Sequence, residues 1–440
     1  MYHATMLSMY QTIRARARET LRWSERYLKT DMVYLAHGGS WLFLSQIVAA
    51  TASLGIAIGF ARFFPREEYG TYKFLLTLLG VITLTCLRGM DSIVTQASSR
   101  NNDGTVLYAL YTKVRWGILG SLCSVGIGVY YYMHANTTIA SAMFLAALFI
   151  PYMDPIGIYS SILNGKRDFR LLAILDSTSQ IAATVILLIG MTYAKSAALL
   201  FFLYCASWTL ARSIALWISL KKYPATNAIE NGWREYGLHT SLVGSMSVVL
   251  ASIDGFAVFH FLGASELAVY TFAMAPILQM RNLSAICTTL ATPKFAIQNG
   301  SVIREHLAHR SRVLFMIGLG VVACWILAAH TVYAVLFPQY IDAVPFSQVF
   351  SITIALSLGS SLVAGVINSR ITLVPKHLLY LWNIPSLILG IGSITLIQYF
   401  GIWGAIVSQI LSSIATASIG WFIWMNIRYR TFSEESAHSA

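Results

Sequence analysis

The chain has 440 residues, of which 57% are hydrophobic and only 11% are charged. An ordinary soluble domain carries roughly 25% charged residues, so this chain has too few polar side chains to cover a soluble fold. The net charge is +12, but the basic residues lie between apolar runs, without an RNP-like, zinc-binding or recognition-helix pattern. This arrangement argues against a nucleic-acid partner and predicts an all-α integral membrane protein in contact with the lipid bilayer.

Residues 1–36 form a basic segment. No apolar run directly follows Met1, so the segment does not resemble a signal peptide. We expect an amphipathic helix on the cytoplasmic membrane surface, where each basic residue contributes about 1 kcal/mol of attraction to anionic headgroups. The alternative is a disordered tail that only fixes topology. Its basic residues are Arg14, Arg16, Arg18, Arg22, Arg26 and Lys29.

Twelve stretches are long and apolar enough to cross a bilayer, which takes about 20 residues each. They predict about 12 transmembrane helices with short connections and no extramembrane domain. The stretches are Gly39–Ala61, Tyr72–Ser98, Leu110–Met133, Ile139–Leu163, Leu171–Tyr193, Ser196–Leu220, Gly237–Leu262, Glu266–Leu290, Arg312–Phe337, Phe346–Asn368, His377–Gln398 and Ile402–Asn426.

Basic residues give these spans an orientation. Most of the 30 Lys and Arg residues fall in segments that the alternation of twelve spans places on the side of the N-terminus. Only Arg62, Arg66, Lys73 and Lys195 fall on the other side. By the positive-inside rule, both the N-terminus and the C-terminal tail 431–440 are expected in the cytoplasm.

A weak internal repeat divides the spans into two sets of six. When the sequence is shifted by 198 positions and aligned with itself, Glu68 falls on Glu266 and Tyr72 on Tyr270. Six spans per half is an even number, so both halves insert with the same orientation. We expect two six-helix lobes, 37–222 and 223–430, with a cleft between them.

Charged residues within spans normally face a cavity or a partner, because a charge at mid-bilayer costs at least about 2.5–3.5 kcal/mol. Arg88 and Asp91 lie three residues apart on one predicted helix face. They could neutralise each other, or Arg88 could face an anionic substrate while Asp91 tempers it. Arg281 has no acidic neighbour within a helical turn, and Gln279 and Asn282 flank it. Such an Arg suits a phosphate or pyrophosphate, the alternative being a side chain that extends to the interface.

Two acidic residues are candidates for ion coupling. Asp254 has no local basic partner and could bind an ion or a proton, pair with an Arg across the cleft, or be a hydrogen-bonded structural residue. Asp154 lies between Pro151 and Pro155, where a kinked helix could line a cavity, or Asp154 could simply cap the kink. Arg212 is expected to extend to the inner interface, and Asp176 lies near an interface and is discounted.

The sequence lacks enzyme and metal motifs. It contains no Walker A, GxSxG or HExxH segment, so we expect neither an enzyme nor coupling to ATP through this chain. The cysteines lie in apolar segments without a CxxC spacing, which predicts no metal site and no cofactor beyond H⁺ or Na⁺ coupling. They are Cys86, Cys123, Cys205, Cys287 and Cys324.

Short motifs spaced along the chain resemble a known family. In this order and spacing they are similar to the polysaccharide-export flippases, the Wzx-type branch of the MOP (MATE-like) exporter superfamily. The similarity runs from about residue 35 to 428. The segments that carry it are Ala61–Tyr72, Leu163–Phe169, Phe261–Ala264 with Tyr270–Ala273, Leu336–Tyr340 and Phe400–Ala405.

This resemblance implies a MATE-like fold and a flippase in a bacterial cytoplasmic (inner) membrane. It would move an undecaprenyl-pyrophosphate-linked oligosaccharide outward across that membrane by alternating access. The product would be O-antigen, capsule or exopolysaccharide. Partners would include a polysaccharide polymerase and a chain-length regulator. The membrane potential favours outward movement of an anion by about 2.3 kcal/mol per charge per 100 mV. The alternatives are a cation-coupled multidrug exporter of the same fold and a membrane polysaccharide polymerase, although the short outside loops disfavour the latter.

Overall fold

The computed structural model describes residues 32–193, 196–297, 300–369 and 376–438. Within these ranges every regular element is a helix. A chain in lipid must satisfy its backbone hydrogen bonds internally, and helices do so within each segment. The predicted basic segment 1–36 lies almost entirely outside the described residues.

The elements of the first half run from Met32 to Lys222. They are α2 (Met32–Phe63), α3 (Arg66–Ile82), η1 (Thr83–Cys86), α4 (Met90–Ser99), α5 (Gly104–Met133), α6 (Thr137–Met153), η2 (Pro155–Ile158), α7 (Tyr159–Gly165), α8 (Phe169–Tyr193) and α9 (Ala197–Lys222).

The elements of the second half run from Trp233 to His438. They are α10 (Trp233–Leu262), α11 (Ala264–Ile297), α12 (Gly300–Leu336), η3 (Pro338–Ala343), α13 (Val344–Phe350), α14 (Ile352–Ser369), α15 (Lys376–Phe400) and α16 (Ile402–His438). Because α16 continues to His438, most of the predicted tail 431–440 extends the last helix.

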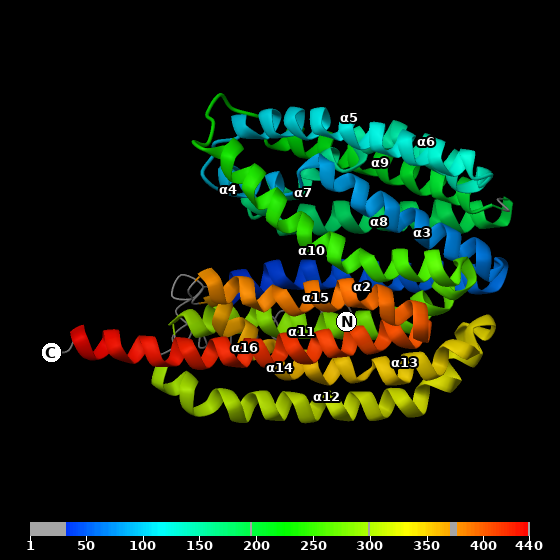
Figure 1. Cartoon of the computed structure of the whole chain (residues 1–440). Coiled ribbons are helices and arrows are strands. Elements are labelled where there is room, and N and C mark those ends of the chain that lie inside the picture. Colours follow the sequence, from blue (N-terminus) through cyan, green and yellow to red (C-terminus); the bar gives the residue numbers. More distant parts are fainter. Residues whose placement is uncertain (1–31, 194–195, 298–299, 370–375, 439–440) are drawn as a thin grey trace, which may run out of the picture.

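The predicted spans correspond to the helices of the bundle. Among the described residues, nine helical segments are long and apolar enough to cross a membrane. The three other predicted spans coincide with α5, α11 and α15, which pack within the same bundle (Figure 1). The prediction of about 12 transmembrane helices is consistent with this structure. It differs at 72–98, predicted as one helix, which is broken into α3, η1 and α4.

Turn residues set the ends of several helices. The side chain of Asn136 accepts a hydrogen bond from the Ile139 amide at the start of α6, and Ser196 caps α9 in the same way through Leu199. Gly401, with φ of +60°, forms the sharp connection from α15 to α16. A left-handed residue just after a helix end favours glycine, which has no Cβ to clash.

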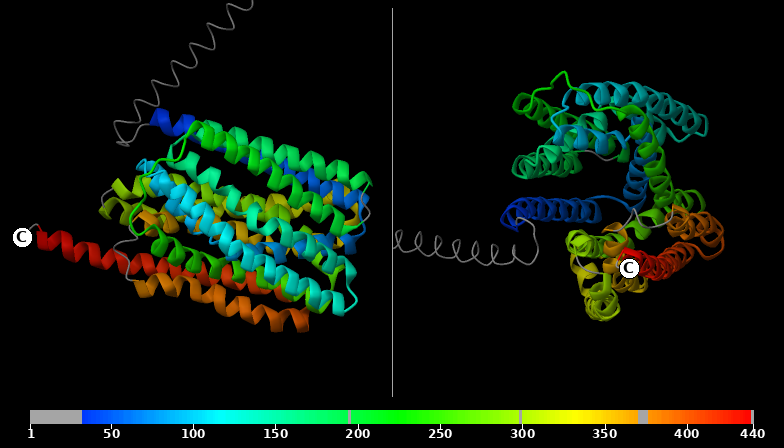
Figure 2. Two further views of the ribbon diagram at one scale, coloured as in Figure 1. Left: turned by 90° about the horizontal axis from the view of Figure 1, so that it is seen from above. Right: turned by 90° about the vertical axis from the view of Figure 1, so that its left-hand side faces the viewer.

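The helices gather into two groups (Figure 1). α3 to α9 form one group, with α2 packed along α8, and α11 to α16 form the other. The end view in Figure 2 shows the two groups one above the other. α10 packs against α3 and α4 of the first group and against α15 of the second, so the exact lobe boundary near residue 222 stays a prediction.

A buried aromatic core joins the two groups at the bundle end opposite the end of α16. Tyr69 of α3 lies 4.8 Å from Phe272 of α11, centroid to centroid, and Phe272 stacks on Tyr340 of η3 at 3.9 Å. Beside them Arg66 forms an ion pair with Asp342 at 2.5 Å. Aromatic pairs of this kind contribute about 0.5–1.5 kcal/mol beyond the burial of their area, so this end of the bundle is closed by contacts between the halves.

The backbone of Gly70 in α3 lies directly against the carbonyl of Ala264, and a Cβ at Gly70 would overlap that carbonyl. We expect Gly70→Ala to lower the melting temperature of the purified protein, because overpacking costs about 1–3 kcal/mol. Gly80→Ala is the matched control in the same helix, since a Cβ there meets no atom within 4 Å. Equal melting temperatures for the two variants would contradict this account of the closed end.

Candidate functional site

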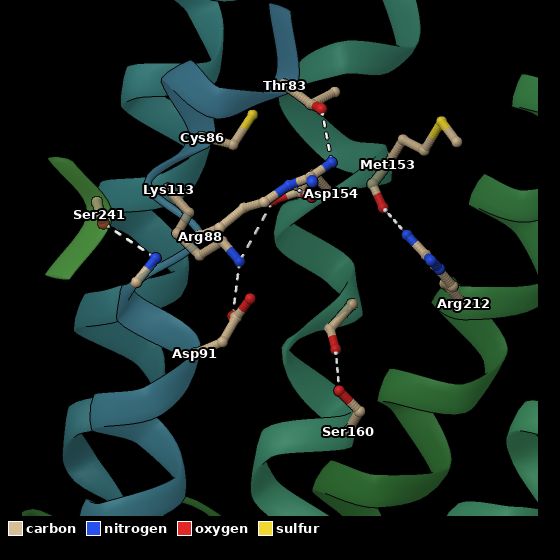
Figure 3. A network of polar contacts seen from close by, with 12 residues as sticks. Thr83, Cys86, Arg88, Asp91, Lys113, Met153, Asp154, Ser160, Arg212 and Ser241 are labelled. Atoms are coloured by element: carbon tan, nitrogen blue, oxygen red, sulfur yellow. Dashed lines mark hydrogen bonds and ion pairs between the residues drawn. The ribbon is translucent and has the colours of Figure 1, made fainter. Parts of the chain in front are cut away.

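Two broken helices meet in the first half of the chain (Figure 3). The α3–η1–α4 segment breaks at Leu87, which has a left-handed φ of +56°. The α6–η2–α7 segment breaks at Asp154, where Pro151 lies inside α6 and Pro155 opens η2. The two breaks touch, since the Cys86 Sγ lies 3.5 Å from the carbonyl oxygen of Ile150. Broken helices at membrane depth are tolerated where they are buried in protein or line a cavity.

Four charged side chains come together at these breaks. Arg88 Nε donates to Asp154 Oδ1 at 3.1 Å. Lys113 Nζ, from α5, lies 2.7 Å from Asp91 Oδ1 and 3.4 Å from Asp154 Oδ2. The Lys113 side chain is 0% exposed. Two cations and two carboxylates therefore neutralise one another, and we call these residues the charge cluster.

The structure does not pair Arg88 with Asp91, which were expected three residues apart on one helix face. The break at Leu87 takes Arg88 off the regular α4 helix, which begins at Met90. Arg88 instead reaches Asp154 and also donates to Thr83 Oγ1 at 2.8 Å. Lys113, near the start of the third predicted span, lies inside the bundle as the partner of Asp91.

A cavity of about 790 Å³ opens beside the charge cluster. Its lining comes only from the first half of the chain and mixes charged, hydroxyl, amide and aromatic side chains. The lining residues are Ser45, Gln46, Ala49, Leu76, Leu79, Gly80, Thr83, Arg88, Asp91, Met153, Asp154, Gly157, Tyr159, Ser160, Asp176, Gln180, Tyr204, Trp208 and Arg212. We call it the first cavity.

Two residues given little weight from sequence line this cavity. Arg212 donates to the Met153 carbonyl at 3.1 Å and lies 4.7 Å above the Trp208 ring, so it points into the bundle. Asp176 accepts a hydrogen bond from the Tyr159 hydroxyl at 2.6 Å. Hydropathy alone could not distinguish these positions from interfacial ones, because both lie within two or three turns of a helix end.

The second half of the chain has a smaller cavity of about 280 Å³, which we call the second cavity. Arg281 is the charged residue in its lining. The rest of the lining is rich in hydroxyl groups, namely Ser357, Ser360, Ser386, Ser412, Ser413 and Thr416, together with Gln409. Among the described residues no carboxylate forms an ion pair with Arg281.

Gln279 and Asn282, the amides that flank Arg281 in sequence, are not in the lining of the second cavity. Both side chains are exposed, and Asn282 Nδ2 donates to Gln279 Oε1 at 3.3 Å. On a helix they lie on a different face from that on which Arg281 meets the serines. The structure thus brings Arg281 together with residues of α14, α15 and α16.

Asp254 of α10 is buried, and side chains from three other helices surround it. Ser393 donates to Oδ1 at 2.7 Å, and Tyr270 donates to Oδ2 at 3.3 Å. The Gln409 amide also donates to Oδ2. Gln409 lines the second cavity as well, so a single side chain separates Asp254 from that cavity. No described Arg or Lys pairs with Asp254.

A family model described as "Polysaccharide biosynthesis protein" matches residues 35–296, more than half of the chain. No curated protein matches the chain.

Several solved structures have the same fold. An inward-facing multidrug resistance MATE family transporter of the MOP superfamily has a TM-score of 0.63 at 16% identity, over 87% of this chain and 94% of that one. The outward-facing form has a TM-score of 0.61 at 16% identity, over 90% and 94%. A MOP superfamily transporter from Pyrococcus furiosus, described as having a binding pocket of reverse polarity, has a TM-score of 0.53 at 15% identity, over 90% and 94%.

Replacing Lys113 by Met should lower the melting temperature, because it removes the buried cation that neutralises Asp91 and Asp154. Adding Asp91→Asn to this variant should recover part of the loss, since it removes the carboxylate left without its partner. Melting temperatures of the two single variants and the double variant measure the coupling.

Lys221→Met is the matched control, since Lys221 is exposed in the last turn of α9. If the double variant lost as much stability as the sum of the two single ones, the pairing of Lys113 with Asp91 would be refuted.

Proposed function

Because the chain belongs to the polysaccharide biosynthesis protein family and has the fold of MOP superfamily transporters, it is a membrane transporter or flippase, and we propose that its substrate is an undecaprenyl-pyrophosphate-linked oligosaccharide. In this proposal the chain moves the repeat units across the bacterial cytoplasmic membrane by alternating access, for surface polysaccharide assembly. Both termini lie in the cytoplasm, and a polymerase and a chain-length regulator act with it.

The unopposed Arg281 of the second cavity is the observation that carries this proposal. A lone guanidinium in a partly buried site attracts an anion, and its fork of donors matches phosphate oxygens. The surrounding serine and threonine hydroxyls can donate to further oxygens of the same group. A cationic drug would be repelled there, so the second cavity supports a pyrophosphate rather than the substrate of a multidrug exporter.

The first cavity suits the sugar part of the same substrate. The charge cluster at its wall is neutral, and the lining also holds one further cation, Arg212, and one further carboxylate, Asp176, so it offers hydrogen-bonding groups without a large net charge. Trp208 and Tyr204 add aromatic faces to Gln46 and Gln180, which can donate and accept. The volume of about 790 Å³ lies within the range of small-molecule sites. Arg88 and Asp91 would act here as polar contacts for the glycan.

Asp254 remains the better candidate for coupling to H⁺ or Na⁺. Asp154 is already matched by Arg88 and Lys113, whereas Asp254 has only neutral partners among the described residues. A buried carboxylate with neutral partners can gain a proton without disrupting an ion pair. The hydroxyls of Ser393 and Tyr270 can adapt to either protonation state.

Arg281→Ala should reduce translocation at least about tenfold, the effect of losing one charged hydrogen bond to phosphate. The measurement is the flipping of a fluorescent lipid-linked oligosaccharide in proteoliposomes. Arg281→Lys should retain part of the activity, because it keeps the charge without the fork. Arg312→Ala is the control, since Arg312 is exposed on α12. Normal flipping by R281A, or efflux of cationic drugs by the wild type, would overturn the assignment.

Asp254→Asn should abolish any proton movement that accompanies substrate translocation. A side-chain amide, unlike a carboxylate, does not take up a proton near neutral pH. A pH-sensitive dye inside proteoliposomes reports that movement. The control is Asp342→Asn, which alters an exposed carboxylate that pairs with Arg66. Unchanged proton flux in D254N would remove Asp254 from the coupling mechanism, while leaving the anion site at Arg281 intact.

A further inference from the structure

We propose that a surface groove between α5 of the first half and the beginning of α10 binds the headgroup of an anionic phospholipid from the membrane leaflet nearest the end of α16. This lipid would be a bound component of the protein rather than its cargo. The proposal does not depend on the substrate proposed above.

The groove has a volume of about 490 Å³ and combines basic with aromatic side chains. Arg115 and Arg234 supply the charge, and Tyr108, Tyr111, Trp116 and Trp233 supply the rings. The Tyr108 and Trp233 rings, from the two different helices, lie 6.3 Å apart. Tyr and Trp are enriched at headgroup level in membrane proteins, and basic pockets between helices on the cytoplasmic side bind anionic headgroups.

Three other basic residues at this end of the bundle have carboxylate partners. Arg100 pairs with Glu230 at 2.5 Å, Lys166 with Asp103 at 2.6 Å and Lys222 with Asp168 at 2.5 Å.

In contrast, Arg115 and Arg234 are exposed, and neither forms an ion pair with another described residue. Glu235 follows Arg234 in sequence but is not in the groove lining, which contains no carboxylate. The groove is therefore a positive site that lacks an internal counter-ion.

The shape of the site favours a lipid over a soluble phosphate. Side chains on a helix tilt toward its N-terminus, so Arg115 points back to the end where α5 begins. Leu119 lines the other end of the groove, and one turn further along α5 Leu122 is 63% exposed. A headgroup on the arginines would thus place its acyl chains along an exposed apolar face of α5.

The groove is separate from the first cavity. Lys113, which holds the charge cluster, lies on α5 between Tyr111 and Arg115 in sequence, but its side chain is fully buried while theirs are exposed. The two sites therefore use opposite faces of the same helix. Changes to Arg115 or Arg234 leave the residues assigned to the substrate in place, so lipid binding and transport can be measured independently.

Native mass spectrometry of the purified full chain tests the proposal, with phosphatidylglycerol and phosphatidylcholine of identical acyl chains as probes. We expect wild-type protein to bind phosphatidylglycerol preferentially, and R115Q/R234Q to bind it about tenfold more weakly, since both charged contacts are lost. The matched control is R310Q/R312Q, which removes two exposed arginines of α12 at the same end. It should bind phosphatidylglycerol like the wild type.

Three results would overturn the proposal. One is equal phosphatidylglycerol binding by R115Q/R234Q and the wild type. Another is displacement of the lipid by glycerol 1-phosphate, which would indicate a soluble phosphate site. The third is preferential binding of undecaprenyl phosphate, which would make the groove a site for the carrier lipid.

A photo-reactive phosphatidylglycerol tests the same site in the unaltered protein, should the double variant fail to fold. Labelling should fall on the first half of α5 or the first turn of α10. Labelling confined to other helices would equally refute the assignment.

Discussion

The buried ammonium of Lys113 is the constraint on which the first half of the structure depends. A cation with no exposed surface inside a membrane bundle must be neutralised, and here two carboxylates from different broken helices do so. Asp91 belongs to α4, and Asp154 lies at the break after α6. Lys113 thus links α4 to the break that follows α6. Arg88 completes the balance, and the wall of the first cavity follows from that arrangement.

The two halves differ in their distribution of charge. In the first half, the cluster matches each basic group with a carboxylate. In the second half, Arg281 faces hydroxyl and amide groups, while the buried acid Asp254 is held by neutral donors on the other side of Gln409. Opposite charges are thus paired in the first half and kept apart in the second half. A substrate with an anionic end and a neutral polar end suits such a division.

Much of this architecture can be predicted from the sequence, because hydropathy and the alternation of basic residues act over whole spans. The twelve predicted spans follow from these two signals. The kink between Pro151 and Pro155 follows from the prolines themselves. The break at Leu87 could not be predicted, since no proline or glycine immediately precedes it and tertiary ion pairs stabilise it.

The partners of the charged residues in the first half likewise could not be predicted from the sequence. Arg88 pairs with Asp154, 66 positions further along the chain, and Lys113 pairs with Asp91, 22 positions earlier in the chain. Arg212 and Asp176 were underrated for the same reason, because sequence gives depth along a helix but not the direction of a side chain.

Leu87 gives the first half a local store of conformational energy. A branched residue with a left-handed φ of +56° is about 1–2 kcal/mol less stable than in a right-handed helix. Joining α3 to α4 in one continuous helix would release that energy, while it would also carry Arg88 away from Asp154 and turn the α4 backbone away from Ser241, which now hydrogen-bonds to the Gly89 amide at 3.0 Å. The two effects oppose each other: the left-handed conformation of Leu87 favours a straight span, and the contacts of Arg88 and Gly89 favour the bent one. A ligand that touches Arg88 would act on that balance directly.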